Sequence, residues 1–498
     1  MKYVDSWLHI PKNEVSEQDM SGLKKIFTVN EKDFYSGEER ESKHYQETES
    51  EYLFPRYALQ TLQGVENRCQ EGQDISIESE IKYRFPEQKE AVNFILNNDC
   101  GTIKCTTGFG KTVVAIKAIS EIKKKTLIFV DVYNLGDQWK ERFREHSNLK
   151  EEDIGKLDTK LDLDHPIVIT TIQSVLARLR LDKEHFTNVM KEANFGMVIF
   201  DEVHCLIGPE KFTEAVSVCF CKKLIGLSAT PYKNFEREHI LMSWLSRSMY
   251  VYDKYEIIPK IKIIRFRNNI PLKTKRYIMW GGYFRKQRYY KQLIKHAGFL
   301  KMVCTLIKSG YTTQRKTLLL VGGIKNEVLQ TIQQMLIQEF TIPENDVALY
   351  VGGTSRDLLA RPIILSNFSM AYKGLDEKRL DTLIVMTSVA SHTYIEQSIG
   401  RIVREHPDKK EPTVVDFVDE DEQLYNCNAM RLFPANMRFP KRMKTVTKIQ
   451  LNEKGEEEEV EIKVPVQEED EKPGPDLRDE FNNRLRLYEK KKFIILPY

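Results

Sequence analysis

Short apolar runs rich in β-branched residues alternate from about residue 80 onward with longer segments of mixed polarity, and this alternation restricts the fold more than any other feature. Parallel strands that are buried on both faces and joined by crossover helices produce such a pattern. The strands expected in the first half are 102–105, 126–130, 167–171, 197–200 and 224–227. Those expected in the second half are 318–321, 347–351, 363–368, 382–386 and 413–417, with a helix at 325–340. The sequence therefore predicts an α/β fold with parallel sheets.

The length of the chain favours two such lobes over one very wide sheet. It has 498 residues, whereas a single hydrophobic core stops growing at about 250–300 residues. The expected divisions are a small N-terminal accessory domain (1–79), a first lobe (80–256), a basic, aromatic-rich connector (257–310), a second lobe (311–422) and a C-terminal extension with an acidic insertion (423–498).

Charge is distributed unevenly, although the formal net charge of the chain is only +3. Residues 257–326 hold 17 Lys and Arg and no Asp or Glu, which favours nucleic acid as a partner. Aromatic residues between these cations could stack on bases, at Tyr277, Trp280, Tyr283, Phe284, Tyr289 and Tyr290. Alternatively, a helix with an ordinary core stripe would bury Tyr290, Leu293, Ile294, Ala297 and Leu300.

The acidic stretch at 453–476 has a composition that cannot bury a core. As an insertion it could stay solvated, dock a basic partner, or occupy the basic groove in place of DNA.

The eight cysteines form no CxxC pair, which predicts neither a zinc site nor a disulfide framework. No stretch reaches the roughly 18 apolar residues of a membrane helix, and the first residues lack the apolar core of a signal peptide. We therefore expect a soluble intracellular protein.

The segment CTTGFGKT follows an expected strand and precedes an expected helix, VVAIKAISEI. Glycines at such a junction let backbone N–H groups approach phosphate oxygens, so Gly108, Phe109 and Gly110 would form a phosphate cradle. Cys105 replaces the first glycine of the general pattern GxxxxGK[ST]. The alternative is a glycine-rich turn that opens an ordinary helix.

A second element, VIFDEVH, weakens that alternative. Lys111 would neutralise the β- and γ-phosphates and the Thr112 hydroxyl would bind Mg²⁺. Asp201, at a strand end, would reach Mg²⁺ through its water shell, and Glu202 would orient the attacking water. His204 fits a coupling role better than a zinc site, because no second His is near.

Four motifs occur in the order that is typical of superfamily-two helicases: TTGFGKT, DEVH (201–204), SAT (228–230) and QSIGRIVR (397–404). The resemblance covers roughly residues 80–420. RFPEQKEAV (84–92) and GLDEKRLDTLIV (374–385) are most similar to the group that contains phage recombination helicases, the eukaryotic excision-repair helicase and the poxvirus transcript-release helicase. HYQETESEYLFPRYALQ resembles the lead-in of helicases from large cytoplasmic DNA viruses, which suggests a viral source.

The resemblance implies two tandem RecA-like lobes that bind ATP and Mg²⁺. Gln88 would read the adenine. In the second lobe the family places at the nucleotide the residues Gly374, Asp376, Gln397, Arg401 and Arg404, with the two arginines as fingers that complete the site when the lobes close. Closure would be transmitted to the nucleic acid by His204, Ser228 and Thr230.

The family also implies contacts with nucleic-acid phosphates, which position a strand without reading its bases. The matching residues are Thr171, Gln173, Gly352, Gly353 and Ser366. One departure concerns the segment VDVYNLGDQW, where the family has Pro-Thr and this chain has Asp131 and Val132. A phosphate contact is therefore in doubt there.

The sequence thus predicts an ATP-driven translocase on DNA that acts in viral transcription, recombination or repair, with 3′ to 5′ movement implied by the resemblance. An RNA helicase is one alternative. The other is a subunit of a transcription complex that clamps nucleic acid without useful turnover. Expected partners are DNA and transcription or repair proteins, a monomer is favoured, and a viral protein would act in the host cytoplasm and be carried in the virion.

Overall fold

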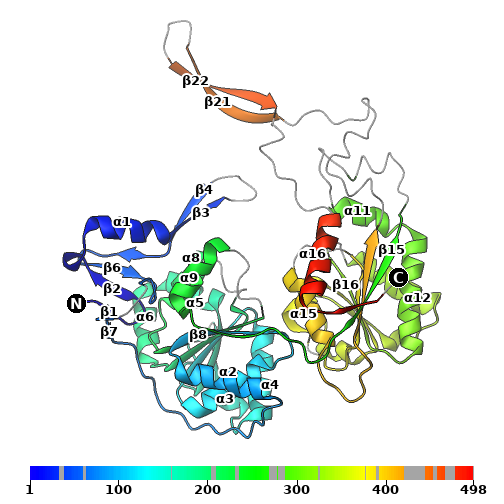
Figure 1. The fold of residues 1–498 in the computed structure, drawn as a ribbon, viewed down its shortest axis with the longest axis horizontal. Coiled ribbons are helices and arrows are strands. Elements are labelled where there is room, and N and C mark those ends of the chain that lie inside the picture. Colours follow the sequence, from blue (N-terminus) through cyan, green and yellow to red (C-terminus); the bar gives the residue numbers. More distant parts are fainter. Residues whose placement is uncertain are drawn as a thin grey trace. The chain divides into compact units, whose positions relative to one another are not determined.

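The computed structural model describes residues 1–32, 39–59, 63–158, 160–203, 209–229, 235–268, 278, 286–322, 326–375, 377–387, 392–419, 443–451, 457–465 and 477–496. The chain divides into two compact units, Met1–Lys254 and Tyr255–Tyr498. Each unit has a central sheet with helices on both faces (Figure 1). Within the described residues, no helix has the length and apolar character needed to cross a membrane.

The first unit contains a seven-stranded parallel sheet in the order β10-β11-β9-β12-β13-β8-β14. Its strands are β8 (Cys100–Cys105), β9 (Thr126–Val130), β10 (Ile154–Leu157), β11 (Ile167–Thr171), β12 (Met197–Phe200), β13 (Lys223–Ser228) and β14 (Met249–Tyr252). All five strands expected in this half are confirmed. The edge strands β10 and β14 were not predicted, because each is short and only the buried strands stand out as continuous apolar runs.

Helices cover both faces of this sheet. One layer consists of α2 (Pro86–Asn97), α3 (Lys111–Ile122) and α4 (Tyr133–His146). The other consists of α5 (Ile172–Leu181), α6 (Lys183–Glu192), α8 (Pro209–Val216) and α9 (Phe235–Leu245). Because the strands are parallel, the carboxyl ends of β8, β12 and β13 meet at one edge of the sheet, where ligands bind in folds of this class.

Residues 1–79, expected as a separate accessory domain, are part of the first unit. They form a sheet in the order β5-β6-β2-β1-β7, a helix and a hairpin. The elements are β1 (Tyr3–Val4), β2 (Leu8–Pro11), α1 (Glu17–Ile26), β3 (Thr28–Lys32), β4 (Glu39–Lys43), β5 (Gln46–Glu47), β6 (Glu51–Phe54) and β7 (Glu66–Asn67). Trp7 packs edge-on against Trp244 of α9 at 4.9 Å between ring centroids. The buried Arg56 donates to the carbonyls of Cys219 and Cys221, so this region and the lobe share one core.

The second unit repeats the architecture of the first. Its seven-stranded parallel sheet has the corresponding order β17-β18-β16-β19-β20-β15-β23. The strands are β15 (Lys260–Phe266), β16 (Thr317–Val321), β17 (Val347–Tyr350), β18 (Ile363–Asn367), β19 (Thr382–Val385), β20 (Thr413–Asp419) and β23 (Ile494–Ile495). One face carries α11 (Lys286–Leu293), α12 (Ala297–Thr312) and α13 (Glu327–Gln338), and the other α14 (Phe368–Gly374), α15 (His392–Ile402) and α16 (Leu477–Lys490). Two RecA-like α/β lobes are thus confirmed.

The basic segment 257–310 was expected to be a connector, but its described parts belong to the second lobe. Its strand β15 pairs with both β20 and β23, and α12 covers the sheet. Tyr290, Leu293 and Leu300 are buried in the core, as the core-stripe alternative predicts, whereas Ala297 is exposed. Tyr289 is buried as well. The aromatic residues Tyr277, Trp280, Tyr283 and Phe284 lie outside the described residues.

The C-terminal extension returns to the second lobe, where α16 packs on the sheet and β23 adds its last strand. Before them, β21 (Met443–Leu451) and β22 (Glu457–Pro465) pair with each other as an antiparallel hairpin. Most of the acidic stretch 453–476 lies outside the described residues, apart from β22.

Candidate nucleotide-binding site

The loop between β8 and α3 has the backbone shape of a phosphate cradle. Gly108 and Gly110 adopt φ values of 95° and 91°, in the left-handed region that favours glycine. A Cβ at Gly110 would lie 2.8 Å from the amide nitrogen of Gln88 and would displace that side chain, in addition to the strain from the backbone conformation. Phe109, between them, is buried against the rings of Phe85 and Tyr252. The N-terminus of α3 therefore opens from a tightly constrained loop.

Side chains from α2 and the residues before it hold this loop from the outside. The buried Gln88 donates from Nε2 to the Phe109 carbonyl at 2.7 Å and accepts the Arg84 N–H at 2.9 Å. Arg84 donates to the carbonyl oxygens of Gly108 and Phe109 at 2.8 and 3.3 Å. Gln88, predicted to read adenine, thus also fixes the loop. Sequence reasoning missed Arg84, although it is the first residue of the RFPEQKEAV segment.

Lys111 and Thr112 form the first residues of α3 and are half-buried. The Lys111 ammonium donates to the carbonyl of Cys105, the last residue of β8, at 3.1 Å. Backbone N–H groups at a helix N-terminus and a lysine beside them attract phosphate oxygens. The structure therefore brings Gly108, Gly110, Lys111 and Thr112 into one cradle at the carboxyl edge of the sheet.

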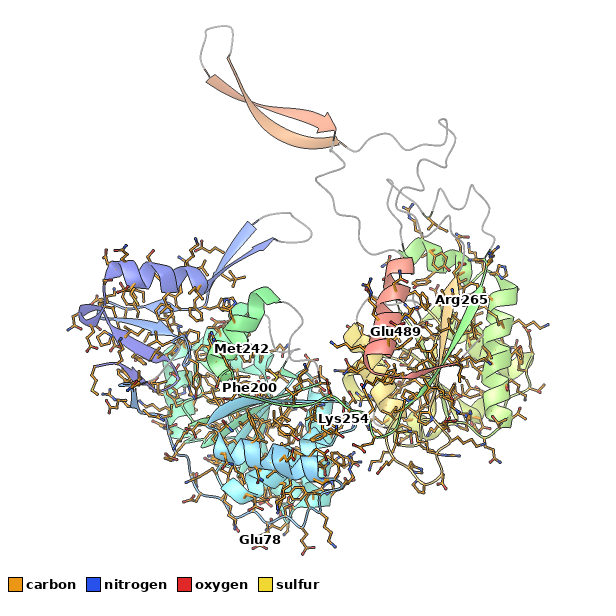
Figure 2. The ribbon with its side chains drawn as sticks, viewed as in Figure 1. Glu78, Phe200, Met242, Lys254, Arg265 and Glu489 are labelled. Atoms are coloured by element: carbon orange, nitrogen blue, oxygen red, sulfur yellow. The ribbon has the colours of Figure 1, made fainter. Side chains whose placement is uncertain are left out.

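Asp201 and Glu202 directly follow β12, whose last residue, Phe200, is labelled in Figure 2. Asp201 is only 9% exposed, and its carboxylate accepts the Trp139 indole N–H at 2.8 Å and the Glu202 N–H at 3.0 Å. Burial, and next to it the Glu202 charge, raise the pKa of Asp201 to about 6, whereas Trp139 and Lys111 act in the opposite direction. Glu202 has a φ of 47°, a conformation that side chains rarely adopt and that concentrates at functional sites.

These groups fit a magnesium ion bound with a nucleotide. A hydroxyl at Thr112 and a carboxylate at Asp201 are hard oxygen donors, which suit Mg²⁺. The charge of Lys111 lies near enough to Asp201 to favour its ionised form. In the part of the chain that the structure describes, no group of three or more His, Cys, Asp or Glu is arranged to hold a metal ion. Mg²⁺ usually keeps several waters and binds one or two protein groups together with substrate phosphates, which two donors such as Thr112 and Asp201 fit.

In the second unit, α15 carries Gln397 and Arg401 one turn apart, and Arg404 follows the helix. Gln397 and Arg401 are buried, and the Gln397 Nε2 has no hydrogen-bond partner among the described residues. Lys409 donates to the Arg404 carbonyl at 2.7 Å and holds the turn beyond the helix. A buried amide without a partner is costly unless a ligand satisfies it, so the arrangement agrees with a role at nucleotide.

Comparisons with known proteins agree with the assignment of these residues to a nucleotide-binding site. A family model described as type III restriction enzyme, res subunit, matches residues 81–233. A putative ATP-dependent RNA helicase of Acanthamoeba polyphaga mimivirus is 27% identical over 335 residues, which cover 65% of this chain and 61% of that protein. The chain is thus similar to helicases of superfamily 2. Members of this superfamily use ATP and Mg²⁺ and bind nucleic acid.

Two further similarities cover smaller or more divergent regions. The DNA 3′-5′ helicase XPB of Kineococcus radiotolerans is 27% identical over 165 residues, 33% of this chain and 29% of that protein. Among solved structures, the Hef helicase domain of Pyrococcus furiosus covers 68% of this chain and 96% of that chain, with 14% identity and a TM-score of 0.43.

The predicted phosphate contacts of the superfamily fall into two groups in this structure. Gln173, Gly352 and Gly353 are exposed, and a Cβ on either glycine would meet nothing within 4 Å. Thr171 and Ser366 are buried with their hydroxyls engaged: Thr171 caps α5 by accepting the Ser174 N–H at 3.2 Å, and Ser366 donates to the Tyr350 carbonyl at 2.7 Å. The exposed group is therefore the one that is free to reach a strand.

The two sheets also show which of these residues occupy equivalent positions. Ser366 corresponds to Thr170, because each donates to the carbonyl of its partner on the neighbouring edge strand, at 2.7 and 2.9 Å. Thr171 corresponds to Asn367, which caps α14 by accepting the Met370 N–H at 2.9 Å.

The remaining predicted residues are placed only in part. Ser228 is buried at the end of β13, and Gly374 is the last residue of α14. His204, Thr230 and Asp376 lie outside the described residues. A further residue that sequence reasoning missed is Trp139, which lies in the quoted segment VDVYNLGDQW but contacts a carboxylate 62 positions away.

Proposed function

We propose that the chain is an ATP-dependent translocase that moves on DNA and unwinds or remodels it during viral transcription, recombination or repair. The observation that carries the proposal is the meeting of Lys111, Asp201 and Glu202 at the carboxyl edge of the first sheet. Support for DNA comes from the acid-free segment 257–326 and from the XPB relatives, which are named as DNA helicases with 3′-5′ polarity.

In the proposed mechanism, the phosphates of ATP lie against the N-terminus of α3, and Lys111 neutralises the β- and γ-oxygens. Thr112 and Asp201 would hold Mg²⁺, which lowers the repulsion between the phosphates during transfer. Glu202 orients the attacking water and takes up its proton. By the resemblance to helicases, Gln397, Arg401 and Arg404 would act on a bound nucleotide, with the arginines stabilising the charge on the transferred phosphate.

Steady-state ATPase measurements test this proposal. The wild type should be stimulated by single-stranded or duplex DNA, and both Lys111→Ala and Glu202→Gln should abolish the stimulated rate. Lys89→Ala, an exposed lysine on α2, is the matched control and should behave as the wild type. Turnover that persists in Lys111→Ala would refute the assignment of the site.

An RNA track is the second candidate, because the mimivirus relative is named as a putative RNA helicase. If RNA stimulates the ATPase rate more than matched DNA does, the track is RNA. A protein that binds DNA but shows no turnover with any nucleic acid would instead support a clamp within a larger complex.

A further inference from the structure

Trp139 is a buried tryptophan of α4 that ends on the carboxylate of Asp201. Its side chain is only 1% exposed, and its indole N–H donates to Asp201 Oδ2 at 2.8 Å. The ring packs near Phe143 of the same helix, at 5.9 Å between centroids. An indole at this depth is fixed by its packing, so the direction of its N–H is fixed as well.

Hydrogen bonds fix both carboxylate oxygens of Asp201 and also its backbone N–H. Oδ2 accepts the Trp139 N–H, and Oδ1 accepts the N–H of Glu202 at 3.0 Å. The backbone N–H of Asp201 donates to the Phe129 carbonyl on β9 at 2.9 Å. Two donors from different elements therefore define the plane of the carboxylate and leave further lone pairs on each oxygen.

The chemistry of an indole suits this task. Its N–H only donates, so it cannot present a competing acceptor to the carboxylate. It is also neutral, whereas a lysine or arginine would form an ion pair and offset the charge that a cation needs. Trp244 shows that burial alone does not create such a bond, because it is equally buried in the same unit and its Nε1 has no partner among the described residues.

We propose that Trp139 is a positioning residue that holds the Asp201 carboxylate in the orientation required to bind the magnesium ion of a Mg²⁺–nucleotide complex. This inference rests on the proposed function, since it assumes that Asp201 serves the ion. Partners that orient a metal-binding carboxylate in this way change metal affinity or activity by about 10–100-fold when they are removed.

The test is equilibrium binding of a fluorescent ADP analogue, measured with Mg²⁺ and with EDTA, so that activity is not the readout. Trp139→Phe removes the N–H and keeps an aromatic ring. We expect the Mg²⁺-dependent gain in affinity to fall by about tenfold, with little change in EDTA. Trp244→Phe makes the same substitution where no hydrogen bond is lost, and it should bind as the wild type.

Two further variants separate orientation from packing. Trp139→His leaves a larger gap than Trp139→Phe, because histidine is smaller, but it keeps a ring N–H. It should therefore retain more of the Mg²⁺-dependent affinity than Trp139→Phe. In an Asp201→Asn background, Trp139→Phe should add little, because the two residues act through one contact. The reverse order of His and Phe, or full additivity with Asp201→Asn, would overturn the positioning role.

The outcomes also distinguish this inference from the proposed function. A wild type whose nucleotide binding does not depend on Mg²⁺ would refute both. If Mg²⁺ raises the nucleotide affinity of the wild type and of Trp139→Phe by the same factor, the inference is refuted but the proposed function is not. Equal losses in Mg²⁺ and in EDTA would show that Trp139 only supports the fold.

Discussion

Arg484 and Asp416 form a bidentate ion pair inside the second unit, with Nε–Oδ2 and Nη2–Oδ1 distances of 2.8 and 3.0 Å. Arg484 lies on α16 and Asp416 on β20, and they are 68 positions apart in the chain. The Tyr488 hydroxyl donates to the same carboxylate at 2.9 Å. The pair therefore anchors the C-terminal helix on the sheet after the long insertion between them.

Replacing Arg484 by Met should destabilise the second unit strongly. Removal of one partner leaves the Asp416 charge buried and unpaired, which costs about 3–5 kcal/mol in comparable pairs. Urea unfolding followed by circular dichroism measures the loss. Arg486→Met changes an exposed arginine on the same helix and should alter the free energy of unfolding by less than about 0.5 kcal/mol. Equal unfolding curves for the two variants would contradict this account.

The central strands could be predicted almost to the residue, because burial on both faces leaves continuous apolar runs such as TLIFV and MVIF. Strand β15 could not, since Lys260, Lys262 and Arg265 interrupt its apolar residues and suggested a surface segment. The structure shows that these cations alternate with the buried Ile261 and Ile263. Period-two alternation was the available signal, and the high charge of the whole region concealed it.

The local parts of the candidate site could be predicted from sequence, whereas its long-range contacts could not. The phosphate loop and the DEVH segment depend on residues that are adjacent in the chain. The contact of Trp139 with Asp201 depends on how α4 packs on the sheet, and no spacing encodes it.

Asp201→Asn should stabilise the metal-free protein at neutral and alkaline pH. Since the folded pKa is about 6 and the ordinary value is 3.8, Asp201 binds its proton more tightly in the folded state. Its contribution to stability is complete below pH 3.8 and is lost as the pH rises through about 6. In EDTA, the variant should therefore gain about 1–3 kcal/mol over the wild type at pH 8 and much less at pH 4.5.

Thermal or urea unfolding across this pH range measures the difference. Asp74→Asn is the control, because the Asp74 side chain is 85% exposed and the substitution should give no such pH-dependent gain. A gain for Asp201→Asn that is equal at pH 4.5 and pH 8 would show that the burial of a charge is not its cause.

Gly352→Glu should weaken DNA binding. Gly352 is exposed, has open space around its Cβ position and lies beyond the end of β17, where the sequence resemblance predicts a phosphate contact. A carboxylate there would repel a phosphate, and we expect a several-fold loss of affinity that shrinks at high salt. Fluorescence anisotropy with labelled single-stranded DNA at two salt concentrations measures it. Gly22→Glu, an equally open and exposed glycine on α1, should leave affinity unchanged.

Gln88→Glu should weaken nucleotide binding through the shape of the phosphate loop. The carboxylate could still accept the Arg84 N–H, but it would face the Phe109 carbonyl in place of the amide N–H that now donates to it at 2.7 Å. Because the position is buried, repulsion between the two oxygens cannot be relieved by water, and the 108–110 loop must shift. We expect at least a tenfold rise in the dissociation constant for ATP, with the fold retained.

Asn93→Asp makes the same change from amide to carboxylate at an exposed position of α2 and should bind ATP normally. Normal binding by Gln88→Glu would mean that the loop keeps its shape without this clamp, and Arg84 alone would then have to hold it.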